Sequence, residues 1–325
     1  MRICLIGDNH WRKNLPYGSA FPDERREEWN EVIRTIHKTA KDCEEVVLLG
    51  DIFNAKNNPS SVIRDFVEFL KGFGNKQVHM ITGNHSISPD GTALDFLQKM
   101  EHENWHVYTK PTIVDNMAFV PFLRSGEYDP SFLSGRKVIA LFSHNAVKPS
   151  TRGAMIDETQ EHVWGKEYLE LHSDFSAFGH IHDEEKVSDT IQGAGSIFTN
   201  VVGEHKRAIW KYDTTTKETE RIPLPVRGIY KVMINEPMNG FDEIPEHSIV
   251  KCVVTQKGAD LVHIEELMKR FDAYMIVESY NEGREKHHFE TGAIDISLDS
   301  LLKVYAKERK IDYEKLMQGV NLLNS

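Results

Sequence analysis

Short apolar runs alternate with amphipathic patterns along the first two thirds of the chain. The runs are typical of buried strands and lie at Arg2–Ile6, Val46–Leu49, Val78–Thr82, Met117–Pro121, Lys137–Ser143 and Asp174–Gly179. Between them, apolar residues recur at helical spacing in Glu24–Ala40, Ser60–Leu70, Thr92–Met100 and Glu167–Leu171. This alternation predicts an α/β (α+β) fold with a mainly parallel inner sheet and helices outside it. Later runs, at Ile191–Val202 and Ala208–Tyr212, indicate a second sheet packed on the first.

The polar and then proline-containing segment Asp213–Arg227 is the best candidate for a domain boundary in these 325 residues. Behind it the pattern predicts a small α+β module, with strands at Ile229–Ile234, Ile249–Thr255 and Ala273–Ser279 and a helix at Asp260–Phe271. Two short amphipathic helices are expected in Asp299–Leu323. We therefore predict a core domain over residues 1–215, a second domain over residues 226–292 and a helical tail over residues 295–325.

Polar side chains follow five of the predicted strands at the point where each apolar run stops. They occur in Gly7-Asp8-Asn9-His10, Gly50-Asp51, Gly83-Asn84-His85, Ser143-His144-Asn145 and Gly179-His180-Ile181-His182. Because ligands bind at the carboxyl ends of strands in an open α/β sheet, these side chains are expected to converge. A bridging carboxylate completed by imidazoles and an amide makes a two-metal site, and mixed nitrogen and oxygen ligands suit Mn²⁺, Fe²⁺ or Zn²⁺. Such paired ions serve in-line displacement at phosphorus.

Each of these motifs has an ordinary structural explanation when it is taken alone. Gly50-Asp51 can be a turn or a helix N-cap, and His180-x-His182 can be two residues on one face of a strand. Their joint order, each behind an apolar strand, is what favours a metal site.

Composition limits the partners and the compartment that the chain suggests. The net charge of −11 opposes nucleic-acid binding unless a local basic rim or bound cations offset it. Three scattered cysteines, Cys4, Cys43 and Cys252, predict core thiols rather than a disulfide framework. No apolar run is long enough to span a bilayer, and the N-terminal run is too short for a signal peptide, so we expect a cytoplasmic protein with no membrane partner.

The whole series of motifs resembles the calcineurin-like metallophosphoesterase superfamily. Within it, the chain is similar to SbcD-type nuclease subunits of double-strand-break repair complexes, including phage recombination endonuclease subunits. Four features carry this closer resemblance: Asp51-Ile52-Phe53, Gly195-Ser196 followed by Val202-Gly203-Glu204, a small second domain and a short helical tail. The resemblance implies a two-sheet sandwich flanked by helices, with a capping, DNA-binding domain and a tail that docks an ATPase.

The resemblance also implies a role for each site residue. Asp8, His10 and His182 would hold the first metal ion. Asn84, His144 and His180 would hold the second, and Asp51 would bridge the two. The ions are expected to be Mn²⁺, with Mg²⁺ or Fe²⁺ as alternatives.

A nearby histidine and two departures from the family pattern complete this expected site. His85 would act on the phosphate or the leaving group without binding metal. The family often has His or Asp where this chain has Asn54, and commonly Asp where it has Ser86. Both changes remove a charged partner for His85, although Asn54 can still form a hydrogen bond.

The activity implied is 3′→5′ exonuclease and single-strand endonuclease action on DNA, as one subunit of a complex with an SbcC-like ABC-type coiled-coil ATPase. A homodimer is expected by the same resemblance. Two alternatives stay open: a nucleotide or small-molecule phosphodiesterase, and a noncatalytic scaffold for an ATPase. Protein phosphatases of the superfamily show Asp-Arg-Gly where this chain has Asn54-Ala55-Lys56, which counts against that class.

Basic and aromatic residues near the ligand motifs are candidate contacts to a nucleic-acid backbone, or simply solvated loop residues. They are Arg12, Lys13, Tyr17, Arg124, Lys148 and Arg152. Contacts of this kind position a nucleic acid without reading its sequence.

Overall fold

The computed structural model describes residues 1–16, 22–88, 91–149, 157–233, 244–246, 248–253 and 272–276. The chain divides into two compact units. The first comprises Met1–Leu15, Arg26–Asn200 and Glu204–Arg227, and the second comprises Pro16–Arg25, Val201–Gly203 and Gly228–Ser325. Every predicted metal ligand lies in the first unit.

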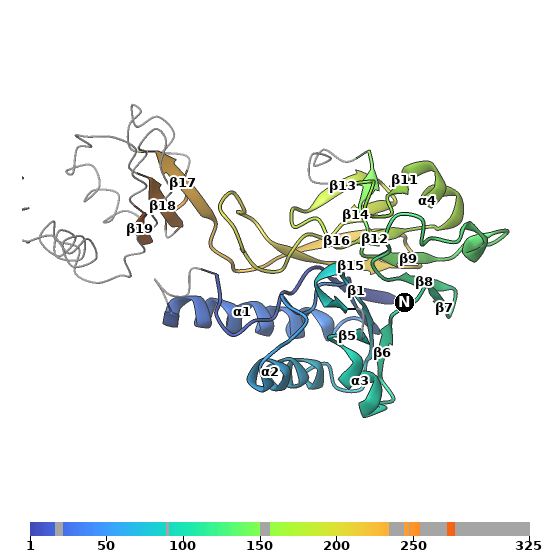
Figure 1. The fold of residues 1–325 in the computed structure, drawn as a ribbon, viewed down its shortest axis with the longest axis horizontal. Coiled ribbons are helices and arrows are strands. Elements are labelled where there is room, and N and C mark those ends of the chain that lie inside the picture. Colours follow the sequence, from blue (N-terminus) through green and yellow to red (C-terminus); the bar gives the residue numbers. More distant parts are fainter. Residues whose placement is uncertain are drawn as a thin grey trace, which may run out of the picture. The chain divides into compact units, whose positions relative to one another are not determined.

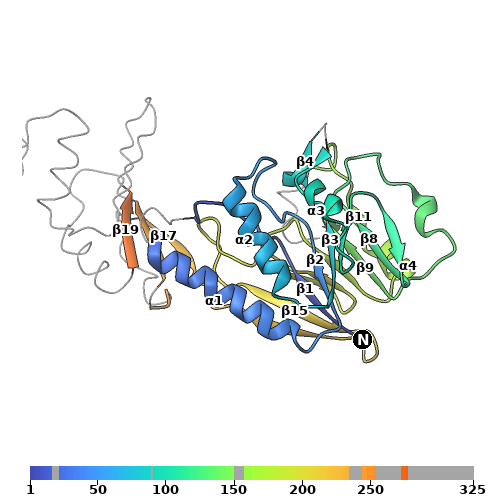
Figure 2. The ribbon, with the colours of Figure 1, turned by 90° about the horizontal axis from the view of Figure 1, so that it is seen from below.

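One six-stranded sheet forms the centre of the first unit, in the order β16-β15-β1-β2-β3-β6. Its strands are β1 (Arg2–Ile6), β2 (Glu45–Leu48), β3 (Gln77–Ile81), β6 (Trp105–Tyr108), β15 (Ala208–Asp213) and β16 (Glu218–Pro223). Strands β1, β2, β3 and β6 run parallel, and β15 and β16 are antiparallel additions at one edge. Figure 2 shows β1, β2 and β3 side by side. The expected mainly parallel inner sheet is confirmed.

A second six-stranded sheet has the order β13-β14-β12-β9-β8-β7. Its strands are β7 (Thr112–Val114), β8 (Met117–Val120), β9 (Ala140–Ser143), β12 (Ser176–Phe178), β13 (Glu185–Ser188) and β14 (Ile191–Gly193). Two short strand pairs lie outside the sheets: β4 (Ile87–Ser88) with β5 (Gly91–Thr92), and β10 (Val147–Lys148) with β11 (Trp164–Gly165). The second sheet packs on the first, as expected, but its strands differ from those we predicted. The run Ala208–Tyr212, expected in the second sheet, forms β15 of the first, and three runs expected in the inner sheet form β8, β9 and β12 of the second.

The helices cover the outer faces of this two-sheet sandwich. They are α1 (Pro22–Ala40), α2 (Ser60–Lys71), α3 (Asp95–Met100) and α4 (Lys166–His172), with 3₁₀ turns η1 (Asn84–Ser86) and η2 (Pro130–Leu133). Figure 1 shows α2 and α3 on one side of β1, and β9, β12 and α4 on the other. Trp29 and Phe66, from α1 and α2, pack on the first sheet, whereas Leu169 of α4 packs on the second.

Strand β1 shows why this layering follows from the sequence. Successive side chains on a strand point to opposite faces of the sheet. Cys4 and Ile6 therefore join the core under α1 and α2, while Ile3 and Leu5 join the core between the sheets. Both faces are covered, so the strand reads as a continuous apolar run rather than an alternating one.

The segment 218–223 forms a strand that we did not predict. Within the candidate boundary Asp213–Arg227, Glu218–Pro223 forms β16, which pairs along its whole length with β15. Most of its side chains are exposed, so its backbone hydrogen bonds rather than an apolar face hold it, and its polar sequence hid the strand. The short strands β6, β7 and β13 were also missed, and only Ile191–Gly193 of the expected strand Ile191–Val202 forms.

The described part of the second unit contains a parallel sheet in the order β17-β18-β19. Its strands are β17 (Ile229–Met233), β18 (Ile249–Val253) and β19 (Asp272–Ile276). The predicted helix Asp260–Phe271 and the predicted tail over residues 295–325 lie outside the described residues. The domain bounds that we predicted therefore stay predictions.

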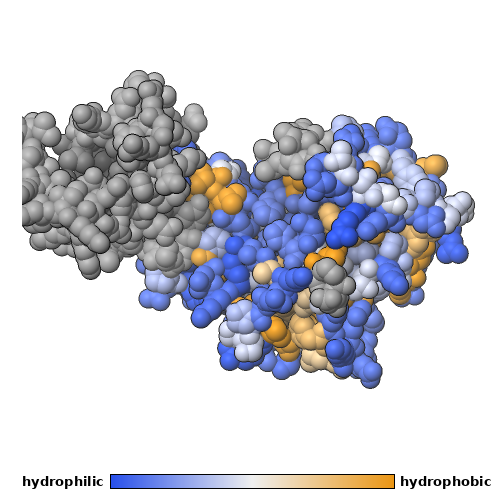
Figure 3. Space-filling view, in the orientation of Figure 1, coloured by the Kyte–Doolittle hydropathy of each residue, from blue (hydrophilic) through white to orange (hydrophobic). Residues whose placement is uncertain are grey.

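The surface of the first unit is mostly polar on the face shown in Figure 3, where hydrophobic residues lie in small separate groups. Met100 and Leu171 are large apolar residues that stand exposed. Within the described residues, no helix combines the length and the apolar character that crossing a membrane requires.

Candidate metal centre

The candidate ligands come from loops that follow β1, β2, β3, β9 and β12, at one edge of the sandwich. Three of them, His10, Asp51 and His180, have left-handed backbone with φ of 50°, 38° and 75°. Non-glycine residues rarely adopt this conformation, and where they do the strain is commonly tied to function. The sharp turns at these residues allow side chains that follow different strands to point into one site.

A first group of ligands joins the loop after β1 to the loop after β12. His10 Nε2 lies 2.9 Å from His182 Nε2, and His182 Nε2 lies 3.8 Å from Asp8 Oδ2. One ligand atom from each of these residues lies within 4.8 Å of the others. The three residues that were predicted to hold the first metal ion are therefore adjacent.

A second group gathers around Asn84. Its side-chain Oδ1 lies 3.1 Å from His144 Nε2 and 3.2 Å from His180 Nδ1. His144 Nε2 also lies 3.3 Å from Asp51 Oδ2. The residues predicted for the second metal ion thus meet as well, with the predicted bridging carboxylate among them.

Asp51 lies within reach of both groups. Its ligand atoms fall within 4.8 Å of those of His10 and His85, and also of those of Asp8 and His144. Burial favours the neutral form of Asp51, but the positive charge of His144 outweighs it and holds the carboxyl pKa below its usual range. Burial instead dominates at Asp8, whose pKa is raised.

The arrangement of lone pairs indicates that a cation belongs here. His144 Nδ1 lies 2.6 Å from the Leu49 carbonyl oxygen, so it donates its proton there and leaves the lone pair of Nε2 facing two oxygen atoms. The buried Asp8 Oδ2 has no hydrogen-bond donor. Acceptors that face one another need a proton or a metal ion between them, so these residues fit a metal centre.

The pKa shifts of the ligands agree with this arrangement of facing acceptors. Burial lowers the pKa of His144, but Asp51 and Asp8 outweigh it and raise the pKa to about 9. Burial lowers the pKa of His10 to about 3. In the absence of metal, a proton on His144 is therefore the charge that compensates the two carboxylates.

Two glycines keep space for the ligands. A Cβ at Gly179 would lie 2.6 Å from Asp8 Oδ1 and 2.8 Å from His144 Nδ1. Gly50 has φ of 98°, and a Cβ there would collide with the ring of His144. The glycines in front of the ligands thus serve close packing as well as turning.

His85 lies beside the ligands, with 45% of its side chain exposed. Its Nε2 is 3.8 Å from Asp51 Oδ2, and its Nδ1 is 3.1 Å from the main-chain oxygen of Asn54. Nδ1 therefore donates to Asn54, and Nε2 is turned toward the site. The sequence led us to look for a side-chain contact from Asn54, but the main chain makes it, so the residue type at this position matters less than we expected.

Two buried glutamates were not predicted as parts of the site. Glu161 Oε2 lies 2.8 Å from His180 Nε2, and Glu204 Oε1 lies 2.9 Å from His182 Nδ1. Glu204 Oε2 also lies 2.8 Å from Arg207. Burial opposes ionisation of Glu204, but His182 and Arg207 outweigh it and lower its pKa to about 2. Glu204 stands in the motif Val202-Gly203-Glu204, for which the sequence indicated no role, whereas Glu161 lies in no motif.

The candidate nucleic-acid contacts differ in availability. Arg12 is engaged by the protein itself, donating to the His10 carbonyl at 3.0 Å and to Asn200 Oδ1 at 2.8 Å. Lys148 pairs with Glu158, while the Arg124 side chain is 68% exposed. Tyr17 and Arg152 lie outside the described residues.

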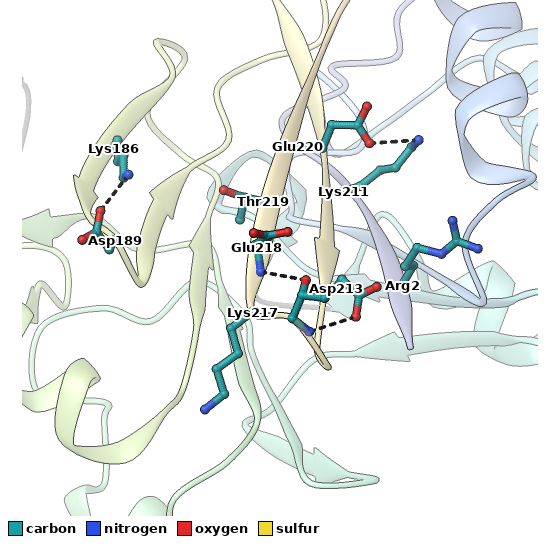
Figure 4. A pocket seen from close by; sticks show the side chains of 10 residues that line it. Arg2, Lys186, Asp189, Lys211, Asp213, Lys217, Glu218, Thr219 and Glu220 are labelled. Carbon is teal, nitrogen blue, oxygen red and sulfur yellow. Dashed lines mark hydrogen bonds and ion pairs between the residues drawn. The ribbon is translucent and has the colours of Figure 1, made fainter.

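A cavity of about 640 Å³ opens along β15 and β16, and it contains none of the predicted ligands. Figure 4 shows basic and acidic side chains alternating around it, with Lys211 paired to Glu220 at 3.2 Å and Lys186 to Asp189 at 2.8 Å. Because these charges neutralise one another, the cavity offers no strong field to an anion.

Comparison with known proteins agrees with the geometry. The profile of the calcineurin-like phosphoesterase family matches residues 1–195, which include all seven predicted ligands. The chain belongs to this family. No curated protein matches the chain.

Solved structures similar to this phosphoesterase include two with distant sequences. An archaeal phosphodiesterase is 18% identical, with a TM-score of 0.38 over 69% of this chain and 100% of its own. A protein of Thermus thermophilus is 12% identical, with a TM-score of 0.42 over 69% of this chain and 98% of its own.

Proposed function

We propose that this metal-dependent phosphoesterase is the DNA nuclease subunit of an SbcC/SbcD-like recombination and repair complex. It would act as a 3′→5′ exonuclease and single-strand endonuclease. A pair of divalent ions, when bound, would activate a water molecule and neutralise phosphoryl oxygens. Asp51 would bridge the ions, and the remaining ligands would hold one ion each.

The position of His85 carries the proposal. The ligands Asp8 and His144 are fully buried, whereas the neighbouring His85 side chain is 45% exposed. Its Nδ1 is held by the main chain of Asn54, so Nε2, which is turned toward the site, can donate a proton to a departing alkoxide. A general acid at the open edge of a metal centre suits a phosphodiester within a long polymer.

The motifs of the closer resemblance occupy places that support the nuclease branch. Phe53 forms a backbone bridge to Trp11, and Ser196 forms one to Asp8. Glu204 holds His182. These segments build the walls of the site, so their likeness to SbcD-type subunits concerns the site rather than distant surface.

Substrate comparison tests the proposal. The full chain, loaded with Mn²⁺, is given linear duplex DNA, single-stranded DNA, a chromogenic diester and a cyclic nucleotide. We expect nucleotide release from DNA ends at the highest kcat/KM. Faster turnover of the cyclic nucleotide than of DNA would support the small-molecule phosphodiesterase instead.

The proposed partners need a separate test. We propose DNA, an SbcC-like ATPase bound through residues 295–325, and a second copy of this chain. Co-purification from the native host, followed by the Mn²⁺ nuclease assay with and without ATP, is expected to recover the ATPase and an ATP effect. Substantially fewer than two ions per metal-replete chain would favour the noncatalytic scaffold.

A further inference from the structure

Two buried carboxylates stand directly behind the histidines of the His180-x-His182 motif. Glu161 contacts His180, and Glu204 contacts His182, at 2.8 and 2.9 Å. The glutamate side chains are 8% and 6% exposed. The partner rings of His180 and His182 are 17% and 33% exposed, so water reaches the rings more than the carboxylates. Each carboxylate acts on its histidine at close range.

The two carboxylates contact different ring nitrogens. Glu161 Oε2 lies 2.8 Å from Nε2 of His180, within ion-pair distance but without the geometry of a hydrogen bond, and Nδ1 of the same ring faces Asn84. Glu204 faces Nδ1 of His182, which leaves Nε2 as the lone pair. The nitrogen on the other side of each ring points to a different ligand group, because His180 Nδ1 meets Asn84 and His182 Nε2 meets His10.

We propose that Glu161 and Glu204 are positioning residues, each controlling one of the two metal positions. Glu204 would set the position formed with Asp8 and His10. Glu161 would set the position formed with Asn84 and His144. The inference rests on a site for two divalent ions and is independent of whether the substrate is DNA.

The two pairs differ in how their charge is balanced. Glu204 shares its charge with Arg207, which lies 2.8 Å away and is itself buried. Among the described residues, the only ion pair of Glu161 is the one with His180. A full negative charge behind His180 makes that ring a stronger donor, so loss of the Glu161 charge is expected to cost more metal affinity than loss of the Glu204 charge.

Metal titration of single variants tests the proposal. The full chain is stripped with a chelator and titrated with Mn²⁺ by calorimetry, as wild type, Glu161→Gln and Glu204→Gln. We expect two equivalents in the wild type and one equivalent weakened by roughly 10–100-fold in each variant. The larger loss is expected for Glu161→Gln.

Glu45→Gln is the matched control. Glu45 Oε2 lies 3.3 Å from His79 Nε2, which is the same kind of partly buried pair away from the site. This variant is expected to bind both equivalents as the wild type does. Equal weakening in the control would assign the effect to general loss of a buried charge and overturn the proposal.

The assignment of each glutamate to one position is tested in two backgrounds. In His144→Ala, Glu204→Gln is expected to remove the remaining Mn²⁺, whereas Glu161→Gln adds little. In His10→Ala the order is expected to reverse. Electron paramagnetic resonance should show isolated Mn²⁺ in place of a coupled pair in both single variants.

Two outcomes separate this proposal from the proposed function. Wild-type affinity in both glutamate variants overturns the positioning role and leaves the nuclease proposal standing. Two bound Mn²⁺ ions with the expected variant effects, but no cleavage of DNA, support the positioning role and overturn the nuclease.

Discussion

Two groups of histidines in the described part of the chain differ in where they lie on the strands. The metal-centre histidines follow strand ends, on loops with left-handed backbone at His10 and His180. The second group lies inside strands: His79 in β3 stacks on Phe119 at 4.7 Å and on His106 of β6 at 5.0 Å. We call this second group, completed by Tyr108 and Glu45, the His79 cluster.

The contacts of the two groups explain the difference. In the His79 cluster, Nδ1 of His79 forms a hydrogen bond with the Tyr108 hydroxyl at 2.8 Å, and Nε2 lies 3.3 Å from Glu45 Oε2 without forming one. In the metal centre, His144 Nε2 faces the oxygens of Asn84 and Asp51. Inside a strand, the backbone pairing fixes which face of the sheet a side chain packs on. After a strand ends, the loop backbone can turn so that the ligand side chains point toward one another.

The largest expected difference between the groups is in catalysis. His85→Gln removes the proposed general acid, and we expect kcat on linear DNA to fall by about 10²–10⁴-fold. Metal content should stay at the wild-type level, because the seven predicted ligands remain. His79→Gln, in the His79 cluster, should lower thermal stability and leave kcat unchanged.

Metal analysis decides between two roles for His85. Its ligand atom lies within 4.8 Å of those of His10 and Asp51. Loss of an ion from His85→Gln would therefore make His85 a ligand and contradict the role of general acid.

The same contrast shows what could be predicted from the sequence. The sheets follow from apolar runs such as Arg2–Ile6, and the ligands follow from polar residues placed where those runs stop. His79 lies within a predicted strand, and this position was enough to set it apart from His85. Local sequence patterns were therefore enough to predict most of the strands and the seven ligands of the metal centre.

The rest depended on contacts that no local pattern encodes. Glu161 reaches His180 from a connection between strands and belongs to no motif. The hydrogen bond to His85 comes from the main chain of Asn54, which any residue type supplies. Strand β16 is held by its pairing with β15, although its side chains lack an apolar face.

Without metal, the stability of the protein should depend on pH through His144 of the metal centre. The folded pKa of His144 is about 9, against 6.5 as its ordinary value, because Asp51 and Asp8 outweigh the effect of burial. A raised pKa stabilises the fold below about pH 6.5, and this contribution disappears as pH rises through 9. Metal-free protein should lose on the order of 3 kcal/mol of unfolding free energy over this range.

Denaturant titration at both ends of the range measures this loss. In the protein loaded with Mn²⁺, the unfolding free energy should change much less with pH, because the ion takes the place of the proton. In a metal-free His144→Gln variant, most of this dependence of the unfolding free energy on pH should also disappear. An unchanged pH dependence in that variant would assign the effect to other groups.

Gly179→Ala tests the close packing of the metal centre. The added Cβ would fall 2.2 Å from the main-chain oxygen of Leu49 and within 3 Å of Asp8 Oδ1 and His144 Nδ1, so the main chain and the ligands must both shift. We expect a loss of about 1–3 kcal/mol in stability, together with weaker Mn²⁺ binding. Gly135→Ala is the matched control, because a Cβ there meets no atom within 4 Å and its positive φ of 69° costs stability alone. Equal Mn²⁺ affinity in both variants would show that Gly179 does not shape the site.

The smallest effect is expected from Tyr108→Phe in the His79 cluster. This change removes the hydroxyl that lies 2.8 Å from His79 Nδ1 and keeps the ring, which stacks on Phe119 at 4.4 Å. The hydrogen bond contributes about 1 kcal/mol, so the unfolding free energy should fall by that amount. Metal affinity and kcat should not change, because the cluster packs the sandwich without touching the ligands. A change in either quantity would mean that the two histidine groups are coupled through β3, and the separation drawn between them would fail.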